Sequence, residues 1–179
     1  MIAALRSELF RLRKRAMPWI LLGTLCAVIA VLYGLYLFLV RSGASGLDEA
    51  TIADFREGLR PNSIPDWGML LVQQYGTVLL VILAATLIAN EYGWGTVRTT
   101  LPRTSGRVAF LTAKLVTLLL ATVVAVVAGF IVAIPATIVA SSVEGLDRGL
   151  ESGFVGASIA AMGRTAFVLL PYVALAAMT

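Results

Sequence analysis

The sequence predicts an all-α membrane protein, a polytopic bundle of transmembrane helices. Hydrophobic residues make up 59% of its 179 residues and charged residues only 13%, whereas soluble domains carry about 25% charged residues. The mean hydropathy is +0.92. The chain also contains uninterrupted apolar runs that match or exceed the roughly 20 residues a helix needs to cross a bilayer.

Composition excludes several classes of function. The chain has no histidine and a single cysteine, Cys26, which excludes an internal disulfide, a Cys/His zinc site and Ser-His or Cys-His nucleophilic catalysis. It also lacks the Gly-x-x-x-x-Gly-Lys-Ser/Thr motif of a P-loop. We therefore expect no enzyme activity and no cofactor in this chain. The net charge of +4 could indicate nucleic-acid binding, but basic cytoplasmic loops explain it better, so no nucleic-acid partner is expected.

The first 15 residues predict an amphipathic helix that lies on the membrane surface. Ile2, Leu5, Leu9 and Leu12 recur at spacings of three and four, which places them on one helical face. Basic residues flank this apolar stripe and suit the headgroup region; they are Arg6, Arg11, Arg13, Lys14 and Arg15. A cleaved signal peptide is the competing interpretation, but the apolar run that follows is too long for one.

The apolar runs predict membrane spans in one transmembrane domain that covers residues 1–179. We expect spans at about 16–40, 67–90 and 111–140, and a fourth begun at about 165–179. The third run is long enough that a tilt or a break near Pro135 is expected.

Two polar segments separate these runs on one side of the membrane, at residues 41–66 and 144–164. The first holds five carboxylates without the tight spacing of an acid/base or calcium site, so we interpret it as a solvated face. The second contains Gly145, Gly149 and Gly153. Glycines at every fourth position permit close helix approach, although in a loop they more often form turns.

Basic residues are distributed unevenly between the two sides. The N-terminal segment and residues 90–114 hold nine of the fourteen lysines and arginines, whereas the other polar segments hold eight of the ten acidic residues. Because basic loops stay in the cytoplasm, the N-terminus and residues 90–114 are predicted to be cytoplasmic. We expect a multi-pass protein of the plasma (inner) membrane.

Residues 90–107 form a long basic segment between two apolar runs on the cytoplasmic side. Thr96 can cap a short helix, and Pro102 must end it. Ser105-Gly106-Arg107 then predicts a turn into the next span. We interpret the segment as a small basic helix exposed to a cytoplasmic partner.

The order of residues around this segment is distinctive. It contains, in sequence, Glu91, Gly95-Thr96, Arg98, Leu101-Pro102, Ser105-Gly106-Arg107, Phe110 and Lys114. This order resembles that of the permease subunits of ABC-2-type transporters. The basic N-terminal helix and Leu170-Pro171-Tyr172 in the fourth run fit the same family, so the resemblance covers essentially the whole chain.

The resemblance implies the permease subunit of an ATP-driven transporter, with export as the expected direction. Its partners would be an ABC ATPase subunit, which holds ATP and Mg²⁺, a second permease chain (the same or a different one) and membrane lipid. The cytoplasmic coupling helix would dock on the ATPase through residues 90–107. Its contact residues would be Glu91, Gly95, Thr96, Arg98, Leu101, Arg103 and Arg107, and the N-terminal basic residues and Lys114 would lie at the membrane interface.

The chain differs from this family in one respect, and one other function fits its sequence. Permeases of this family usually have six spans, so we expect the chain to be a fragment that lacks two of them. The alternative function is a structural or regulatory membrane subunit without a transport path. This alternative fits the sequence equally well, because the first three spans contain no ionisable group that would mark an ion pathway. The same observation disfavours proton-coupled transport. An uncharged path would suit an apolar or amphipathic substrate.

Overall fold

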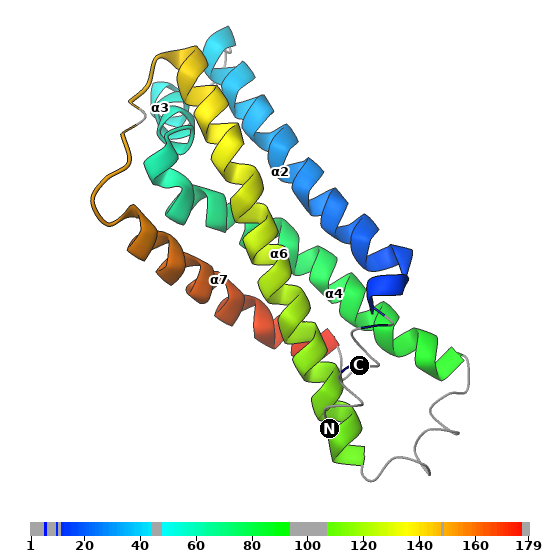
Figure 1. Cartoon of the computed structure of the whole chain (residues 1–179). Helices are drawn as coiled ribbons and strands as arrows, with labels where there is room; N and C mark the ends of the chain where they lie inside the picture. Colours follow the sequence, from blue (N-terminus) through cyan, green and yellow to red (C-terminus); the bar gives the residue numbers. More distant parts are fainter. Residues whose placement is uncertain are drawn as a thin grey trace.

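The computed structural model describes residues 6, 10, 12–43, 48–93, 107–147 and 149–176, which form helices and turns and no strand. The helices are α2 (Ala16–Ser42), α3 (Glu49–Gly58), α4 (Met69–Gly93), α6 (Arg107–Glu144) and α7 (Phe154–Ala176). A 3₁₀ turn, η1 (Pro61–Ser63), and a π-helical turn, η2 (Ile64–Gly68), lead directly into α4. Figure 1 shows the long helices as a bundle, with α3 lying across one end.

Within these residues, four helices are long and apolar enough to cross a membrane. Helices α2, α4, α6 and α7 contain 27, 25, 38 and 23 residues. Ahead of α2, residues 6, 10 and 12–14 are helical, and the extended backbone of Arg15 (φ −81°, ψ 135°) separates them from it. The predicted all-α, polytopic bundle is confirmed.

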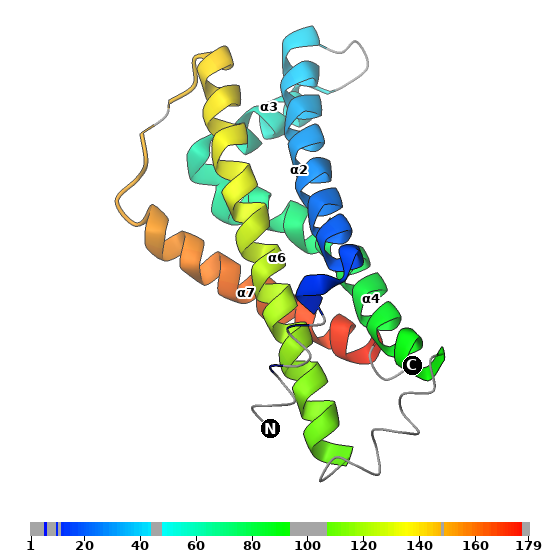
Figure 2. The same ribbon diagram turned by 45° about the vertical axis from the view of Figure 1, so that its right-hand side comes forward.

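The long helices alternate in direction. Helices α2 and α6 run one way and α4 and α7 run back (Figures 1 and 2). Helix α2 packs chiefly against α6, and α4 packs chiefly against α7. The bundle therefore has an N-terminal end, where α2 and α6 start and α4 finishes, and an α3 end, where α3 and the α6–α7 connection lie.

Helix α7 begins at Phe154, eleven residues before the expected start near residue 165. Residues 154–163 carry no charge and can enter a helix beside the bundle. The helix was expected to start after Arg164 because that residue is charged. In the structure Arg164 lies within α7, and its Nη2 is 3.4 Å from Oδ1 of Asp66. Before α7, Gly145 (φ 63°) and Gly153 (φ 120°) adopt left-handed backbone conformations, so these two glycines form turns and not a helix–helix contact.

Helix α6 continues through Pro135. A proline removes one backbone N–H from the helical ladder, which here leaves the carbonyl group of Ile131 without its usual donor. Close by, Oγ1 of Thr137 donates to the carbonyl oxygens of Ala133 (2.9 Å) and Ile134 (3.0 Å). With 38 residues, α6 is roughly 57 Å long, so it extends beyond a hydrocarbon core of about 30 Å.

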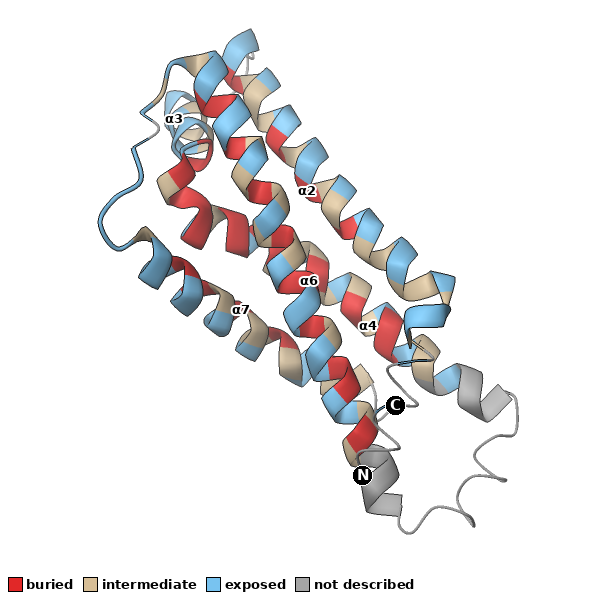
Figure 3. Cartoon of the chain, in the orientation of Figure 1, coloured by how far each residue is buried: buried red, intermediate tan, exposed pale blue. Residues whose placement is uncertain are grey.

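The core lies along the sides of the helices that face one another (Figure 3). Its most buried members include Leu25, Ile29, Val72, Val126 and Leu169, each at most 2% exposed. Large apolar side chains also cover the outward faces, where Phe167 is 75% and Val31 is 68% exposed. In water such an exposed apolar surface would favour aggregation, whereas in a membrane lipid chains cover it.

Candidate functional site

The expected docking segment joins two helices at the N-terminal end of the bundle. Helix α4 ends at Gly93 and α6 begins at Arg107, both toward the end where α2 starts (Figures 1 and 2). Of the expected contact residues, Gly95, Thr96, Arg98, Leu101 and Arg103 lie outside the described residues. Glu91 belongs to the last turn of α4 and Arg107 opens α6, and their side chains also lie outside the described part.

The expected membrane-interface residues lie at the same end. Arg6, Arg13 and Lys14 are exposed, whereas Arg15 and Lys114 are partly buried; Arg11 lies outside the described residues. The ammonium group of Lys14 lies 4.7 Å from the centre of the Phe10 ring, a distance at which cation and ring attract each other.

Trp19 ties the N-terminal segment to the start of α2. Its indole Nε1 donates a hydrogen bond of 3.0 Å to the carbonyl oxygen of Arg13. The ring itself is 57% exposed on the outside of the bundle. A tryptophan with one polar contact and an exposed apolar ring suits the boundary between headgroups and hydrocarbon.

An apolar groove of about 220 Å³ opens beside Trp19 at this end. The short N-terminal segment, α2, α4 and α6 all contribute to its walls. Its lining side chains are mostly leucines, including Leu22, Leu25, Leu79 and Leu83, with Ala121 on α6 and Arg13 at the N-terminal segment. Neither composition nor spacing in the sequence indicated this groove, since it forms only where four segments meet.

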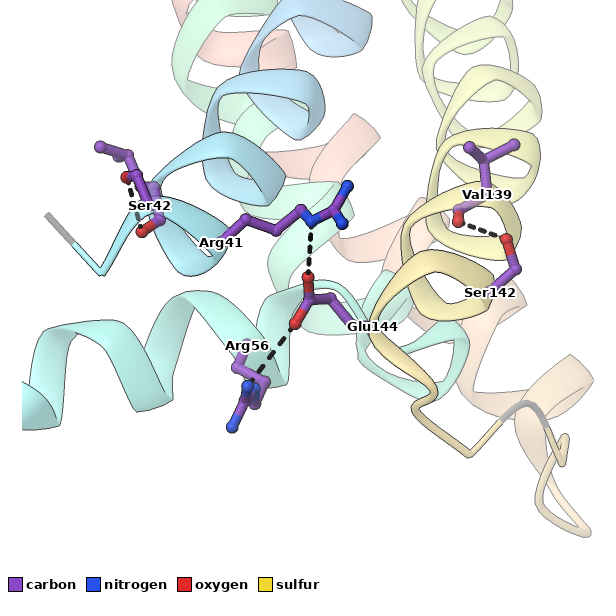
Figure 4. A network of polar contacts seen from close by, with 7 residues as sticks. Arg41, Ser42, Arg56, Val139, Ser142 and Glu144 are labelled. Atoms are coloured by element: carbon purple, nitrogen blue, oxygen red, sulfur yellow. Dashed lines mark hydrogen bonds and ion pairs between the residues drawn. The ribbon is translucent and has the colours of Figure 1, made fainter.

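A cluster of charges lies at the opposite, α3 end (Figure 4). The carboxylate of Glu144, the last residue of α6, lies 3.8 Å from Nε of Arg41 on α2 and 3.5 Å from Nη2 of Arg56 on α3. Only 10% of the Glu144 side chain is exposed. This cluster was not predicted from the sequence. The signal was present, because Arg41 and Glu144 each follow an apolar run that ends on the same side.

Asn62 connects the start of α4 to the connection before α7. Its Nδ2 donates to the carbonyl oxygen of Gly149 (2.8 Å), and its Oδ1 accepts from the backbone N–H of Glu151 (3.2 Å). These two hydrogen bonds connect segments about 90 residues apart at the α3 end. The Arg164–Asp66 pair also links α7 to the turn before α4, but both of its side chains are mostly exposed, so it adds little stability.

The interior of the described bundle carries hydroxyl groups and no buried charge. Thr117 and Thr122 donate to carbonyl oxygens of their own helix at 2.8 and 3.0 Å. The hydroxyls of Tyr33 and Ser158 are buried without a hydrogen-bond partner in the described part of the chain. Among the described residues, no group of three or more His, Cys, Asp or Glu side chains could hold a metal ion.

Comparison with known families identifies the chain. A family model described as ABC-2 family transporter protein matches residues 4–179. No curated protein and no solved structure gives a significant match. With its family match and its helices able to cross a membrane, the chain belongs to the ABC-2 family of transporter proteins and is a multi-pass membrane component of a transporter.

Proposed function

We propose that this chain is the permease subunit of an ATP-driven exporter in the plasma membrane. A separate ABC ATPase subunit, with bound ATP and Mg²⁺, would dock on residues 90–107, and a second permease chain would complete the transport path. The observation that carries the proposal is the position of the two helix ends that flank this basic segment. The segment connects α4 to α6 at the end of the bundle where the N-terminal basic residues also lie.

The charge distribution supports a cytoplasmic location for that end. The described basic residues of the N-terminal segment lie there, together with Lys114; they are Arg6, Arg13, Lys14 and Arg15. The carboxylates whose side chains are described belong instead to the segments at the α3 end, residues 48–66 and 144–151. Basic residues are retained on the cytoplasmic side, which is also where an ATPase would find ATP.

The packing of the helices suggests how docking would move the bundle. Residues 90–107 join α4, which packs chiefly against α7, to α6, which packs chiefly against α2. A displacement of this segment would therefore shift one helix pair against the other. Transport by alternating access requires such rocking, and nucleotide-driven closure of the ATPase would supply the force. Because the described interior carries no buried charge, the path suits an apolar or amphipathic substrate.

Co-purification tests the proposal. A tagged full-length chain extracted in mild detergent should retain a soluble subunit that contains a P-loop, detected by mass spectrometry. Arg98→Glu should reduce the retained subunit roughly tenfold or more, since reversing a charge in an interface costs several kcal/mol. Gly95→Pro should reduce it as well, because proline fixes φ and removes a backbone N–H. Arg60→Glu, an equal charge reversal at the α3 end, should leave it unchanged.

Two results would contradict the proposal. One is the absence of any P-loop protein from the purified complex. The other is an equal loss with Arg60→Glu, which would show that the effect of Arg98→Glu is not local. The first result would favour the alternative of a structural or regulatory membrane subunit without a transport path.

A further inference from the structure

The groove beside Trp19 is shaped for an apolar occupant. Its volume is about 220 Å³, larger than the roughly 150 Å³ of an apolar cavity that stays dry and binds benzene. Its walls on α6 run from Thr117 to Ala125, roughly 12 Å along the helix axis. One leaflet of a bilayer contributes about 15 Å of hydrocarbon, so the groove has the length of an acyl chain segment within one leaflet.

The groove is also accessible from the bilayer. Trp19, Leu120 and Val124 line it and are 57%, 38% and 54% exposed on the outer surface. A molecule could therefore enter sideways from the surrounding lipid without passing through the bundle.

Positive charge lies at the outer edge of the groove. Arg13 contributes to its lining, and Lys14 and Arg15 follow it directly in the chain. Among the described side chains, the ion pairs of the bundle involve Arg41, Arg56, Arg60 and Arg164, and none involves these three cations. The edge therefore complements an anionic group at headgroup depth, where a basic side chain is strongly attracted to negative lipid.

We propose that this groove binds one anionic phospholipid. An acyl chain occupies the apolar groove between α2, α4 and α6, and the headgroup phosphate pairs with the guanidinium of Arg13. Such a lipid would link the N-terminal segment to the three helices that the groove joins. This site requires neither an ATPase nor transport, so its failure and that of the proposed function are distinguishable.

Quenching of Trp19 by brominated lipid tests the site. The full-length chain carrying Trp67→Phe and Trp94→Phe, which leaves Trp19 as the single tryptophan, is reconstituted into zwitterionic vesicles. A small fraction of brominated phosphatidylglycerol or of brominated phosphatidylcholine is then added. The anionic lipid should quench Trp19 with about fivefold higher apparent affinity, the factor that one basic residue near an anionic lipid contributes.

Matched variants separate the headgroup contact from the acyl-chain contact. Arg13→Gln should lower the ratio of the apparent affinities for the anionic and the zwitterionic lipid toward one, and Arg13→Lys should retain the ratio of the parent chain. Arg60→Gln at the α3 end should leave this ratio unchanged. Ala121→Phe fills the groove and should reduce quenching by both lipids. Val123→Phe adds the same side chain at an exposed α6 position outside the groove lining and should not.

Equal quenching of Trp19 by the two lipids in the parent chain would overturn the proposal. Unchanged quenching in a folded Ala121→Phe variant would overturn it as well, because the acyl chain would then lie elsewhere. If Ala121→Phe fails to fold, the comparison of Arg13→Gln with Arg60→Gln tests the proposal instead. An equal preference of the two variants for the anionic lipid would contradict it.

Discussion

Glu144 illustrates how a single charge can require partners from other helices. It is the last residue of α6, where the helix dipole disfavours a negative charge, and its side chain is only 10% exposed. Arg41 on α2 and Arg56 on α3 offset both costs at 3.8 and 3.5 Å. Both arginines remain more than half exposed, so the contact stabilises the α3 end while most of the positive charge stays hydrated.

We predict that Glu144→Gln lowers the free energy of unfolding by about 1–2 kcal/mol, between the values typical of exposed and of buried ion pairs. Thermal unfolding of the purified protein in detergent micelles measures the change. Glu57→Gln is the matched control, because Glu57 and its partner Arg60 are both about half exposed and their pair should contribute almost nothing.

A double-mutant cycle with Arg56→Gln then isolates the contact. The coupling between Glu144 and Arg56 should exceed about 0.5 kcal/mol, the level expected for residues that share an ion pair. Additive effects of the two substitutions, or equal effects of Glu144→Gln and Glu57→Gln, would show that the cluster does not hold the α3 end.

At the level of helices, Gly129 sets how closely α6 approaches α4 and α2. A Cβ atom added at this position would collide with Cγ2 of Val72 and would lie 3.2 Å from Cδ1 of Ile29. Both neighbours are fully buried and cannot move aside easily. Small residues allow close helix approach in membranes, and α6 relies on this glycine to pack against two helices at once.

We predict that Gly129→Ala lowers the free energy of unfolding by about 1–3 kcal/mol, the usual cost of overpacking a core. Gly23→Ala on α2 is the matched control, because an added Cβ there meets nothing within 4 Å. That control should stabilise the protein by up to about 1 kcal/mol through its higher helix propensity. Unfolding in micelles with increasing denaturant measures both, and stabilisation by both substitutions would contradict the close approach.

The whole molecule is polarised along the bundle axis. The described segments at the α3 end carry acidic residues together with paired arginines, whereas the N-terminal end carries arginines and lysines. The alternating directions of the helices place these groups at opposite ends of the bundle. The insertion machinery retains basic segments on the cytoplasmic side, so this polarity should determine the orientation.

Cysteine labelling in intact cells tests that orientation. In a Cys26→Ala background, a cysteine introduced by Asp54→Cys on α3 should react with a membrane-impermeant maleimide added outside. One introduced by Lys14→Cys should react only after the membrane is permeabilised. Both positions are exposed, so accessibility within the bundle does not limit either reaction. The reverse pattern would place the N-terminus outside and contradict the proposed site for an ATPase.

The sequence by itself determined the all-α bundle, the apolar helices and the family. These properties follow from local composition, because about 20 consecutive apolar residues must form a helix that satisfies its own backbone in lipid. The basic segment at 90–107 could be located in the same way, and its docking role stays a prediction.

The tertiary structure alone decided the start of α7 at Phe154, the cluster around Glu144 and the groove beside Trp19. Each of these depends on contacts between distant segments: Arg164 with Asp66, Glu144 with Arg41 and Arg56, and four segments around one groove. Hydropathy describes what a segment buries as a whole. It does not specify which residue on another helix will face it, because that depends on how closely the helices pack.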